Sequence, residues 1–372
     1  MSFHVQKFQG SLSGCIMKTI AHQYIKMSGN PYERGMQYGL AAKERIHKVI
    51  EEYKILFEKE GRMDWETAYR KAAGYQDIIE KTTPELFDEM KGIAEGAGVD
   101  LGTIVLLNCR SEAMFAHPAD ECAVIGIPQE CSKTGSVLMA ENWDWWSIGR
   151  GTTVILEIKQ DPLPSALIIT EAGLVGGKGL NSAGIGLTMN ALSVRDGQYG
   201  LPLQLLLREA LNRKTVPEAL DFLARAKRAG SACVGLGSAD GLLVMVEFAP
   251  KDLDILLSEG KPICHTNHWL SSYMRSGPEA TIYSYRSTFT RLDRVRALTS
   301  QMTKFGPQDL RRILSDHAGY PDSVCRHDDE GVPEYNRHTS LWSMVLDLKK
   351  RTMWLTDDSP CMHDYRAYQL GD

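Results

Sequence analysis

The hydrophobic pattern of this chain changes at Cys122, and that change limits what the chain can fold into. Before it, apolar residues such as Ile46, Val49 and Ile50 recur at spacings of three and four, which is typical of amphipathic helices. After it, short apolar or alternating runs are separated by turn residues, which is typical of strands. Because consecutive strands with short turns form antiparallel sheets, the sequence predicts an α+β protein whose first third is helical.

Helix and turn signals divide these two parts into elements. The first predicted helix begins at the N-cap Asn30, followed by a proline and a capping glutamate, and its apolar stripe continues to Phe57. Gly35 and Gly39 inside it each cost about 1 kcal/mol relative to alanine, so we expect another element to pack very close to them. Further helices are predicted to start after Asp64, Thr83 and Asp100, and to span 202–212, 216–228, 284–303 and 307–317. The predicted strands are 123–127, 136–140, 152–158, 166–170, 185–190, 233–236, 242–248, 254–257, 263–266, 341–348 and 352–355.

No internal repeat or low-complexity linker separates these elements. We therefore predict a single domain over residues 1–372. Within it, residues 1–121 form the helical part and residues 122–372 the part that carries the strands. The helices inserted between strands must cover a sheet face.

Composition and charge exclude several classes of protein. Of the 372 residues, 43% are hydrophobic and 24% charged, which excludes a disordered, collagen-like or coiled-coil chain. Acidic and basic residues are mixed and the net charge is -5, which argues against a nucleic-acid partner. The apolar runs are far shorter than the roughly 20 residues of a membrane helix. The N-terminus lacks a basic-then-apolar signal pattern, so we expect a cytoplasmic protein.

The eight cysteines, at positions 15, 109, 122, 131, 233, 264, 325 and 361, include no C-x-x-C pair. This spacing argues against a structural zinc and against a thioredoxin-like motif. The glycine-rich segment 171–186 fits neither a P-loop nor a dinucleotide-binding motif, because strand residues follow it. We therefore expect no metal and no cofactor, and ask whether one cysteine is a nucleophile.

Cys122 stands where a polar loop becomes the first strand after the helices. A thiol at that junction is able to attack the carbonyl carbon of Glu121, shift the acyl group from nitrogen to sulfur and release a new amino terminus. The freed α-amino group has an ordinary pKa of about 7.7–8.0 and can act as the base for its own thiol. The alternative is a buried structural cysteine, because free cysteine is among the most buried residue types.

The segment Asn142-Trp143-Asp144-Trp145-Trp146 lies one predicted hairpin later. Apolar walls with a few aimed polar groups are typical of ligand sites, so Asn142, Trp143 and Trp145 are candidate substrate-binding residues. The alternative is a turn flanked by aromatic residues of the core.

Two later segments carry further polar candidates. The Asn267 amide at the end of a predicted strand is able to donate to an oxyanion, a contribution typically of about 2.7–4 kcal/mol. His265 and His268 on either side of it are three residues apart and would point to opposite faces of a strand, so they form a poor chelate. Arg326 is able to hold a carboxylate such as Asp144 bidentately. The alternatives are satisfied polar residues of the core around Asn267 and a solvated charged loop around Arg326.

From about Gly29 onward the chain resembles the acyl-coenzyme A:6-aminopenicillanic acid acyltransferase family of cysteine N-terminal nucleophile (Ntn) hydrolases. Each motif alone is weak, but nine occur together in one order. They are Gly-Asn-Pro-Tyr-Glu-Arg-Gly (29–35), Asn-Cys-Arg-Ser-Glu (108–112), Asp-Glu-Cys (120–122), Glu-Asn-Trp-Asp-Trp (141–145), Thr-Glu-Ala-Gly (170–173), Leu-Asn-Ser-Ala-Gly (180–184), Met-Asn-Ala-Leu (189–192), His-Thr-Asn-His (265–268) and Cys-Arg (325–326).

The resemblance implies a four-layer αββα sandwich of antiparallel sheets, made as an inactive precursor (a zymogen). Cys122 would be the nucleophile, freed by autocatalytic cleavage between Glu121 and Cys122, and the two fragments would stay together as a heterodimer. By motif, Asp144 would lie beside the nucleophile and its amino group, Asn267 would donate to the oxyanion, and Arg326 would steady the acidic residue. The family forms a thioester with an acyl group taken from an amide.

We therefore expect a self-processing amidohydrolase that cleaves the amide bond of a small N-acylated amine. One alternative is an acyltransferase that uses acyl-coenzyme A, which would need a basic rim from residues such as Lys178, Arg195 and Arg286. Another is an uncleaved, non-catalytic member that binds a ligand. It is kept open by Glu121 and Ala123, which replace the family's usual glycine before the nucleophile and frequent threonine after it. A side chain before the scissile bond narrows its backbone angles.

Overall fold

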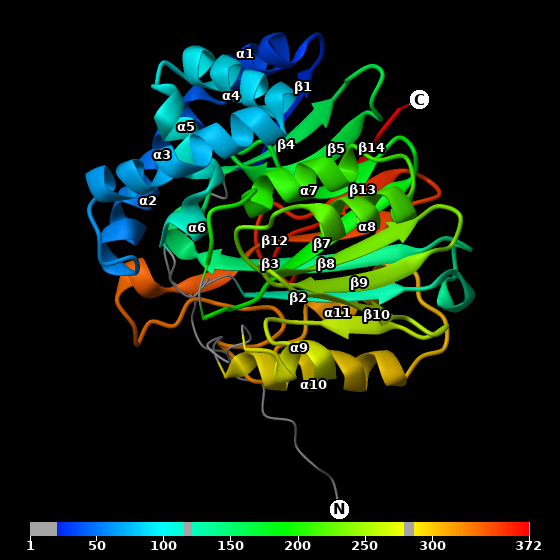
Figure 1. Ribbon diagram of the computed structural model, residues 1–372. Coiled ribbons are helices and arrows are strands. Elements are labelled where there is room, and N and C mark those ends of the chain that lie inside the picture. The colour runs from blue at the N-terminus through cyan, green and yellow to red at the C-terminus, as the bar shows by residue number, and fades with distance from the viewer. Residues whose placement is uncertain (1–20, 115–120, 196, 279–285, 372) are drawn as a thin grey trace, which may run out of the picture.

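Two β-sheets form the centre of the computed structural model, which describes residues 21–114, 121–195, 197–278 and 286–371 (Figure 1). In spatial order, the eight strands of the larger sheet are β1 (Gln23–Met27), β4 (Thr153–Ile158), β5 (Ala166–Glu171), β6 (Lys178–Asn181), β7 (Ile185–Ala191), β8 (Ala232–Ser238), β9 (Leu243–Phe248) and β10 (Leu253–Leu257). The six strands of the smaller sheet are β11 (Ile263–His265), β2 (Glu121–Ile127), β3 (Leu138–Trp146), β12 (His338–Asp347), β13 (Thr352–Leu355) and β14 (Arg366–Gln369).

The prediction of antiparallel sheets is confirmed for every described strand pair but one. The exception is β1, which comes from the helical first third and pairs in parallel with β4 at the edge of the larger sheet. The sequence pattern misses β1, β6 and β14, which have five, four and four residues.

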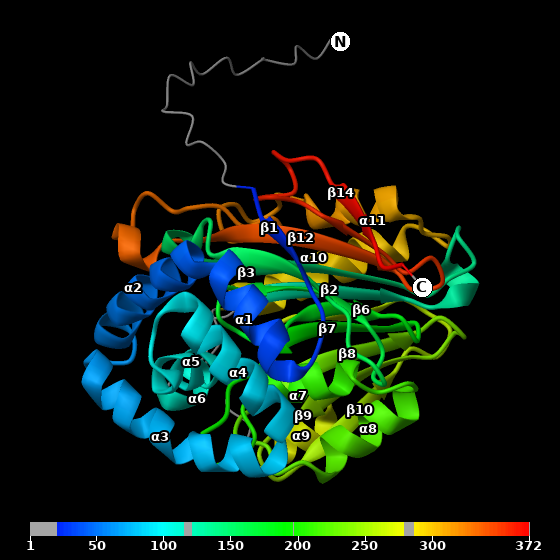
Figure 2. The same cartoon turned by 90° about the horizontal axis from the view of Figure 1, so that it is seen from above.

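Helices cover the outer faces of both sheets, which gives the predicted αββα order of layers (Figure 2). Helices α7 (Leu203–Leu211) and α8 (Val216–Arg225) contact β7 and β8 of the larger sheet. Helices α10 (Ser287–Ser300) and α11 (Pro307–Leu314) contact the smaller sheet at β2, β3, β11 and β12. The two sheets meet where β2 and β3 pack on β7. The α+β class and its four layers are therefore confirmed.

The helical first third packs beside the two sheets (Figure 1). Its helices are α1 (Pro31–Ala41), α2 (Lys43–Lys59), α3 (Trp65–Thr82), α4 (Pro84–Ala97), α5 (Leu101–Asn108) and α6 (Arg110–Met114). One cluster of buried apolar side chains joins these helices to both sheets, from Tyr38 and Phe57 to Leu187 and Met353. The single helix predicted from residue 31 to residue 57 is wrong, because the backbone leaves helical geometry at Ala42 and starts again as α2.

The glycines of the first helix lie where we expect another element to be close. A Cβ atom on Gly35 would stand 1.9 Å from the Glu89 carbonyl oxygen, and one on Gly39 would stand 2.3 Å from the Ile93 carbonyl oxygen. Helix α4 also has a glycine at the crossing: a Cβ atom added to Gly92 would lie 2.2 Å from the backbone of α1. Helices α1 and α4 therefore cross with their backbones in contact, and the packing gained there offsets the low helix propensity of glycine.

Short elements complete the described chain: η1 (Gln129–Cys131), η2 (Ser147–Gly149), η3 (Glu334–Asn336) and α9 (Ser272–Ser276). The helix predicted over 216–228 ends early, at Arg225. The helix predicted over 284–303 corresponds to α10, from Ser287 to Ser300, and its first two residues lie outside the described residues. Within the described ranges, none of the helices has both the length and the apolar character needed to span a bilayer.

Candidate active site

Cys122 is the second residue of β2 and is fully buried. It pairs across the antiparallel ladder with Trp143 of β3, whereas Glu121 pairs with Asp144. Because directly paired residues share a sheet face and successive residues alternate, Cys122 and Trp143 face the core between the sheets. Asp144 faces the other way, toward the layer of α10. The thiol and the carboxylate therefore lie on opposite faces of the smaller sheet, at the same end of the β2–β3 pair.

Asn267 reaches Cys122 because β11 pairs with β2, and the loop after β11 carries the amide to the start of β2. Its Oδ1 accepts a hydrogen bond from the Cys122 backbone N–H at 2.9 Å. Its Nδ2 lies 3.3 Å from the Ala191 carbonyl oxygen, at the end of β7. Its own backbone N–H donates to Thr288 Oγ1 at 2.8 Å. The buried Asn267 side chain therefore joins β2, the strand that carries Cys122, to the larger sheet.

Arg291 of α10 is a functional candidate that sequence reasoning missed. One of its guanidinium nitrogens donates to the Cys122 carbonyl oxygen at 2.8 Å, and the other donates to Asn267 Oδ1 at 3.0 Å. The same guanidinium lies 3.9 Å from the Asp144 carboxylate, and the side chain is only 1% exposed. A signal existed in the sequence, because Arg291 falls on the buried stripe of its helix beside Leu292 and Val295. A charged residue on an apolar helix face needs a buried partner.

Asp144 is buried at the centre of a second chain of hydrogen bonds. Its Oδ1 accepts from Ser340 Oγ at 2.6 Å, and Ser340 Oγ accepts from the Arg326 backbone N–H at 2.9 Å. The Arg326 guanidinium forms an ion pair of 2.6 Å with Asp322. The structure therefore links Arg326 to Asp144 through Ser340, and the bidentate pairing expected from the sequence stays a prediction.

The three predicted substrate-binding residues have different surroundings. Asn142 is fully buried, and its Nδ2 donates to the carbonyl oxygens of Leu314 and Val324, each at 2.8 Å. Trp143 and Trp145 stack with ring centroids 5.4 Å apart, on the sheet face that Cys122 shares. Asn142 therefore holds two loops by their backbone carbonyl groups, whereas the two indoles lie on the sheet face of Cys122.

Lys178 lies among these aromatic rings. Its Nζ is 4.9 Å from the ring centroid of Trp143 and 5.3 Å from that of Trp342, and the residue is 7% exposed. No carboxylate of the described residues lies within ion-pairing distance of this ammonium group, so cation–π contacts offset the cost of burying its charge. Arg195 and Arg286 are exposed, so Lys178 does not join them in a surface rim.

Asn190 of β7 is a further polar residue beside β2, the strand that carries Cys122. It pairs with Cys233, which packs against Val124 in one cluster, so its side chain lies on the face that meets β2. Neither end of its amide has a hydrogen-bond partner among the described residues, and it is 1% exposed. A buried amide without partners requires an explanation, and a bound substrate group is one.

Other cysteines and histidines have structural surroundings. Burial raises the pKa of the Cys233 thiol well above its usual range and that of Cys264 to about 11, which makes both poor nucleophiles. His265 Nε2 lies 2.8 Å from Glu247 Oε1, and burial lowers the pKa of His268 to about 4. Residue 120 of the predicted processing motif lies outside the described residues.

Comparison with known proteins identifies the family. The family model described as acyl-coenzyme A:6-aminopenicillanic acid acyl-transferase matches residues 131–361, which include Asp144, Asn267 and Arg326. This chain belongs to that acyltransferase family. Cys122 precedes the matched range, but the chain is also similar over 332 residues to the 40 kDa form of acyl-coenzyme A:6-aminopenicillanic-acid-acyltransferase from Emericella nidulans. The identity is 29%, over 87% of this chain and 89% of that protein.

Further similarities of this family member are more distant. Protein dcd1A of Dictyostelium discoideum is 24% identical over 265 residues, which are 58% of this chain and 55% of that protein. Penicillin V acylase from Agrobacterium tumefaciens aligns with a TM-score of 0.44 and 15% identity, over 63% of this chain and 82% of that structure. A single-residue variant of conjugated bile acid hydrolase from Clostridium perfringens aligns with a TM-score of 0.47 and 13% identity, over 67% of this chain and 97% of that structure.

Proposed function

We propose that this member of the acyltransferase family is a self-processing amidohydrolase whose nucleophile is Cys122. The observation that carries the proposal is that both backbone polar groups of Cys122, its N–H and its C=O, are held by buried side chains. Asn267 accepts from its N–H, and Arg291 donates to its C=O. A thiol whose own backbone is fixed by a sheet and two buried side chains is preorganised for attack on a neighbouring carbonyl.

In the processing step, Cys122 Sγ attacks the carbonyl carbon of Glu121. The C–N bond between Glu121 and Cys122 breaks, its nitrogen takes up a proton, and the acyl group is left on sulfur as a thioester. Water then attacks the thioester, which releases the Glu121 carboxylate and restores the thiol on a free amino terminus. Two fragments result, held together as a heterodimer by the core that joins the helices to both sheets.

In turnover, the new α-amino group accepts the thiol proton, and the sulfur attacks the carbonyl carbon of an N-acylated amine. The substrate C–N bond breaks, the amine leaves with a proton, and water hydrolyses the acyl thioester. We assign Asn267 to the oxyanion, Asp144 and Arg291 to the charge balance around the amino terminus, and Arg326 to the support of Asp144. Preorganised donors of this kind are worth about 2.7–4 kcal/mol each.

The buried ammonium of Lys178 points to the substrate class. It lies over Trp143 and Trp342, on the sheet face of the nucleophile, and has no carboxylate partner among the described residues. A substrate that carries a carboxylate would supply the missing anion, while the indoles would contact its apolar part. We therefore infer that the substrate is an N-acylated amine with a carboxylate group.

The Emericella nidulans relative favours a second candidate, in which an amine rather than water receives the acyl group from an acyl-coenzyme A donor, because that is the activity in its name. Supplying an amine during thioester turnover separates the two: a new amide product indicates transfer, and free acid alone indicates hydrolysis. None of the seven described cysteines forms a disulfide with another, which supports a reducing compartment such as the cytoplasm.

Denaturing electrophoresis tests the processing step. Wild type is expected to give two bands of about one third and two thirds of the 41.5 kDa chain, the larger beginning with Cys-Ala-Val-Ile-Gly by Edman sequencing. The Cys122→Ala variant is expected to remain one inactive chain, whereas the control variants Cys131→Ala and Cys233→Ala still process. A wild-type protein that stays whole indicates the non-catalytic alternative, and a processed Cys122→Ala chain indicates an external protease.

A further inference from the structure

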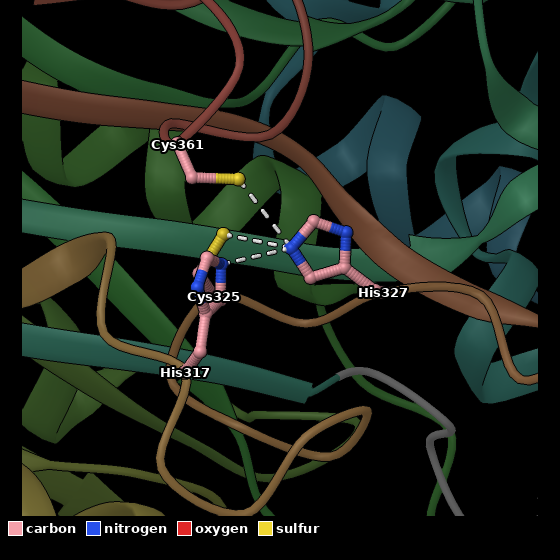
Figure 3. A group of neighbouring side chains, drawn as sticks. All are labelled: His317, Cys325, His327 and Cys361. Carbon is pink, nitrogen blue, oxygen red and sulfur yellow. Dashed lines mark hydrogen bonds between the residues drawn. The ribbon is translucent and has the colours of Figure 1, made fainter. Parts of the chain in front are cut away.

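Four side chains with metal-binding atoms converge on the outer side of the smaller sheet: His317, Cys325, His327 and Cys361 (Figure 3). We call them the Cys2His2 cluster. His317 follows α11, Cys325 and His327 belong to the loop after it, and Cys361 lies between β13 and β14. Their four ligand atoms all lie within 4.8 Å of one another. None of the four belongs to the candidate active site.

Three of the six separations within the cluster, those that meet at His327 Nε2, match the edges of a tetrahedral zinc site. His317 Nε2 and His327 Nε2 are 3.1 Å apart, and His327 Nε2 lies 3.5 Å from Cys325 Sγ and 3.4 Å from Cys361 Sγ. Zinc–nitrogen bonds of about 2.0–2.1 Å and zinc–sulfur bonds of about 2.3 Å place tetrahedral nitrogens about 3.3 Å apart, and nitrogen and sulfur about 3.6 Å apart. Each measured separation lies within a few tenths of an ångström of these values.

Hydrogen bonding alone does not account for this convergence. His327 Nε2 has either one proton or one lone pair, so it forms one good hydrogen bond at a time. Three partners approach it at hydrogen-bonding distance, from two thiols and a second imidazole (Figure 3). A metal ion among the four atoms would satisfy every one of them at once.

We propose that the Cys2His2 cluster binds one zinc ion as a structural site. Two thiolates and two imidazoles are the soft and borderline donors that zinc selects, and their combined charge of −2 is neutralised by the ion. Four protein ligands fill a tetrahedral shell, so no position is left for water or substrate. Oxygen-seeking ions such as magnesium and calcium do not fit this donor set.

The ion would fix the loop that carries Arg326, which stands between the ligands Cys325 and His327. The backbone on either side of that loop is already held, because Asn142 donates to the Val324 carbonyl oxygen and Ser340 accepts from the Arg326 N–H. Zinc would add a tie to the turn at Cys361, 34 residues further along the chain. The metal proposal rests on the cluster alone and does not depend on the proposed reaction.

This proposal departs from the sequence-based expectation of no metal. That expectation used the absence of a C-x-x-C pair, but the two cysteines here are not close in sequence: Cys325 lies near the two histidines, and Cys361 lies 34 residues beyond His327. Only the fold brings Cys361 to the other three.

The test is metal content and cobalt spectroscopy on the full chain, purified without a histidine tag. We expect one zinc per chain by elemental analysis. After zinc is removed by a chelator, cobalt(II) is expected to bind with tetrahedral d–d bands and a thiolate-to-cobalt charge-transfer band of two-sulfur intensity. Cys361→Ser should lose at least half of that charge-transfer intensity, and His317→Asn should lower the zinc content several-fold. The matched controls, Cys131→Ser and His47→Asn, should leave both unchanged.

Several results would overturn the proposal. One is a zinc content below one tenth per chain together with no cobalt uptake, and another is cobalt that binds without a charge-transfer band. A third is full zinc retention in both cluster variants. The fourth is a Cys325–Cys361 disulfide found by peptide mapping of protein kept under anaerobic, thiol-free conditions. Because His317 is exposed, its substitution is not expected to unfold the chain, and circular dichroism verifies that. The cobalt spectrum of the wild type needs no variant at all.

Discussion

Replacement of Arg291 tests whether the buried guanidinium organises the nucleophile. Arg291 donates two hydrogen bonds, to the Cys122 carbonyl oxygen and to Asn267 Oδ1, and lies 3.9 Å from Asp144. A lysine at this position keeps the charge, but its single ammonium group does not reproduce a planar fork. The Arg291→Lys variant therefore loses about one of the two hydrogen bonds.

A hydrogen bond to a charged group is worth about 1.5–3 kcal/mol, and each 1.4 kcal/mol is a factor of ten in rate. We therefore expect Arg291→Lys to slow self-cleavage roughly 10- to 150-fold. The Arg291→Met variant also removes a cation from beside the buried Asp144 carboxylate, which costs about 3–5 kcal/mol of folding free energy. Adding Asp144→Asn removes the uncompensated charge, so the double variant should recover part of that loss.

The assay is the rate at which the uncleaved band disappears after a pulse of synthesis, together with thermal unfolding of each variant. Arg296→Lys, on the exposed side of the same helix, is the matched control and should process like wild type. If Arg291→Lys cleaves at the wild-type rate while remaining folded, the guanidinium does not organise the nucleophile. If the double variant is no more stable than Arg291→Met, the coupling to Asp144 is refuted.

Four further outcomes are expected. Asn267→Ala should lower kcat by about 10²–10³ in processed enzyme with little change in KM, and an unchanged kcat would remove the amide from the oxyanion site. Lys178→Met should raise KM roughly 10- to 100-fold for N-acylated amino acids and leave it unchanged for N-acylated alkylamines, whereas equal effects on both would exclude a carboxylate contact. Gly39→Ala should reduce the free energy of unfolding by about 1–3 kcal/mol in denaturant titrations, because its Cβ would meet the Ile93 carbonyl oxygen, and a stabilised variant would contradict the close crossing. Burial lowers the pKa of His22 to about 4 in the folded chain, so below pH 6.5 the unfolded chain binds a proton at His22 that the folded chain does not. The free energy of unfolding should therefore fall by about 3 kcal/mol between pH 6.5 and pH 4, and His22→Gln should show a shallower fall in unfolding experiments.

Much of the fold follows from patterns that are local in the sequence. The change of period at Cys122 predicted helices before it and antiparallel strands after it, and the N-cap signal at Asn30 corresponds to a complete capping box. Gly35 and Gly39 predicted a close helix crossing that α4 supplies. These predictions succeed because side-chain period, capping and glycine strain each depend on a few neighbouring residues.

The candidate site shows where such reasoning stops. Sequence motifs identified Cys122, Asp144 and Asn267 as candidates. The register of β2 and β3, together with the alternation of side chains along each strand, places the thiol and the carboxylate on opposite faces of the sheet. Arg291 and Lys178 belong to no motif with a known role, and each acquires its partners only from another layer of the sandwich.

The sequence by itself therefore determined the class of fold and the family, and it named Cys122 as the candidate nucleophile, because each of these depends on residue types and their spacing along the chain. Only the tertiary structure decided the parallel pairing of β1 and the two hydrogen bonds that Arg291 donates beside Cys122. It also decided that the side chains of the Cys2His2 cluster lie together. These contacts join segments that are far apart in sequence, and they form because packing two sheets and their helices around one core fixes which distant side chains become neighbours.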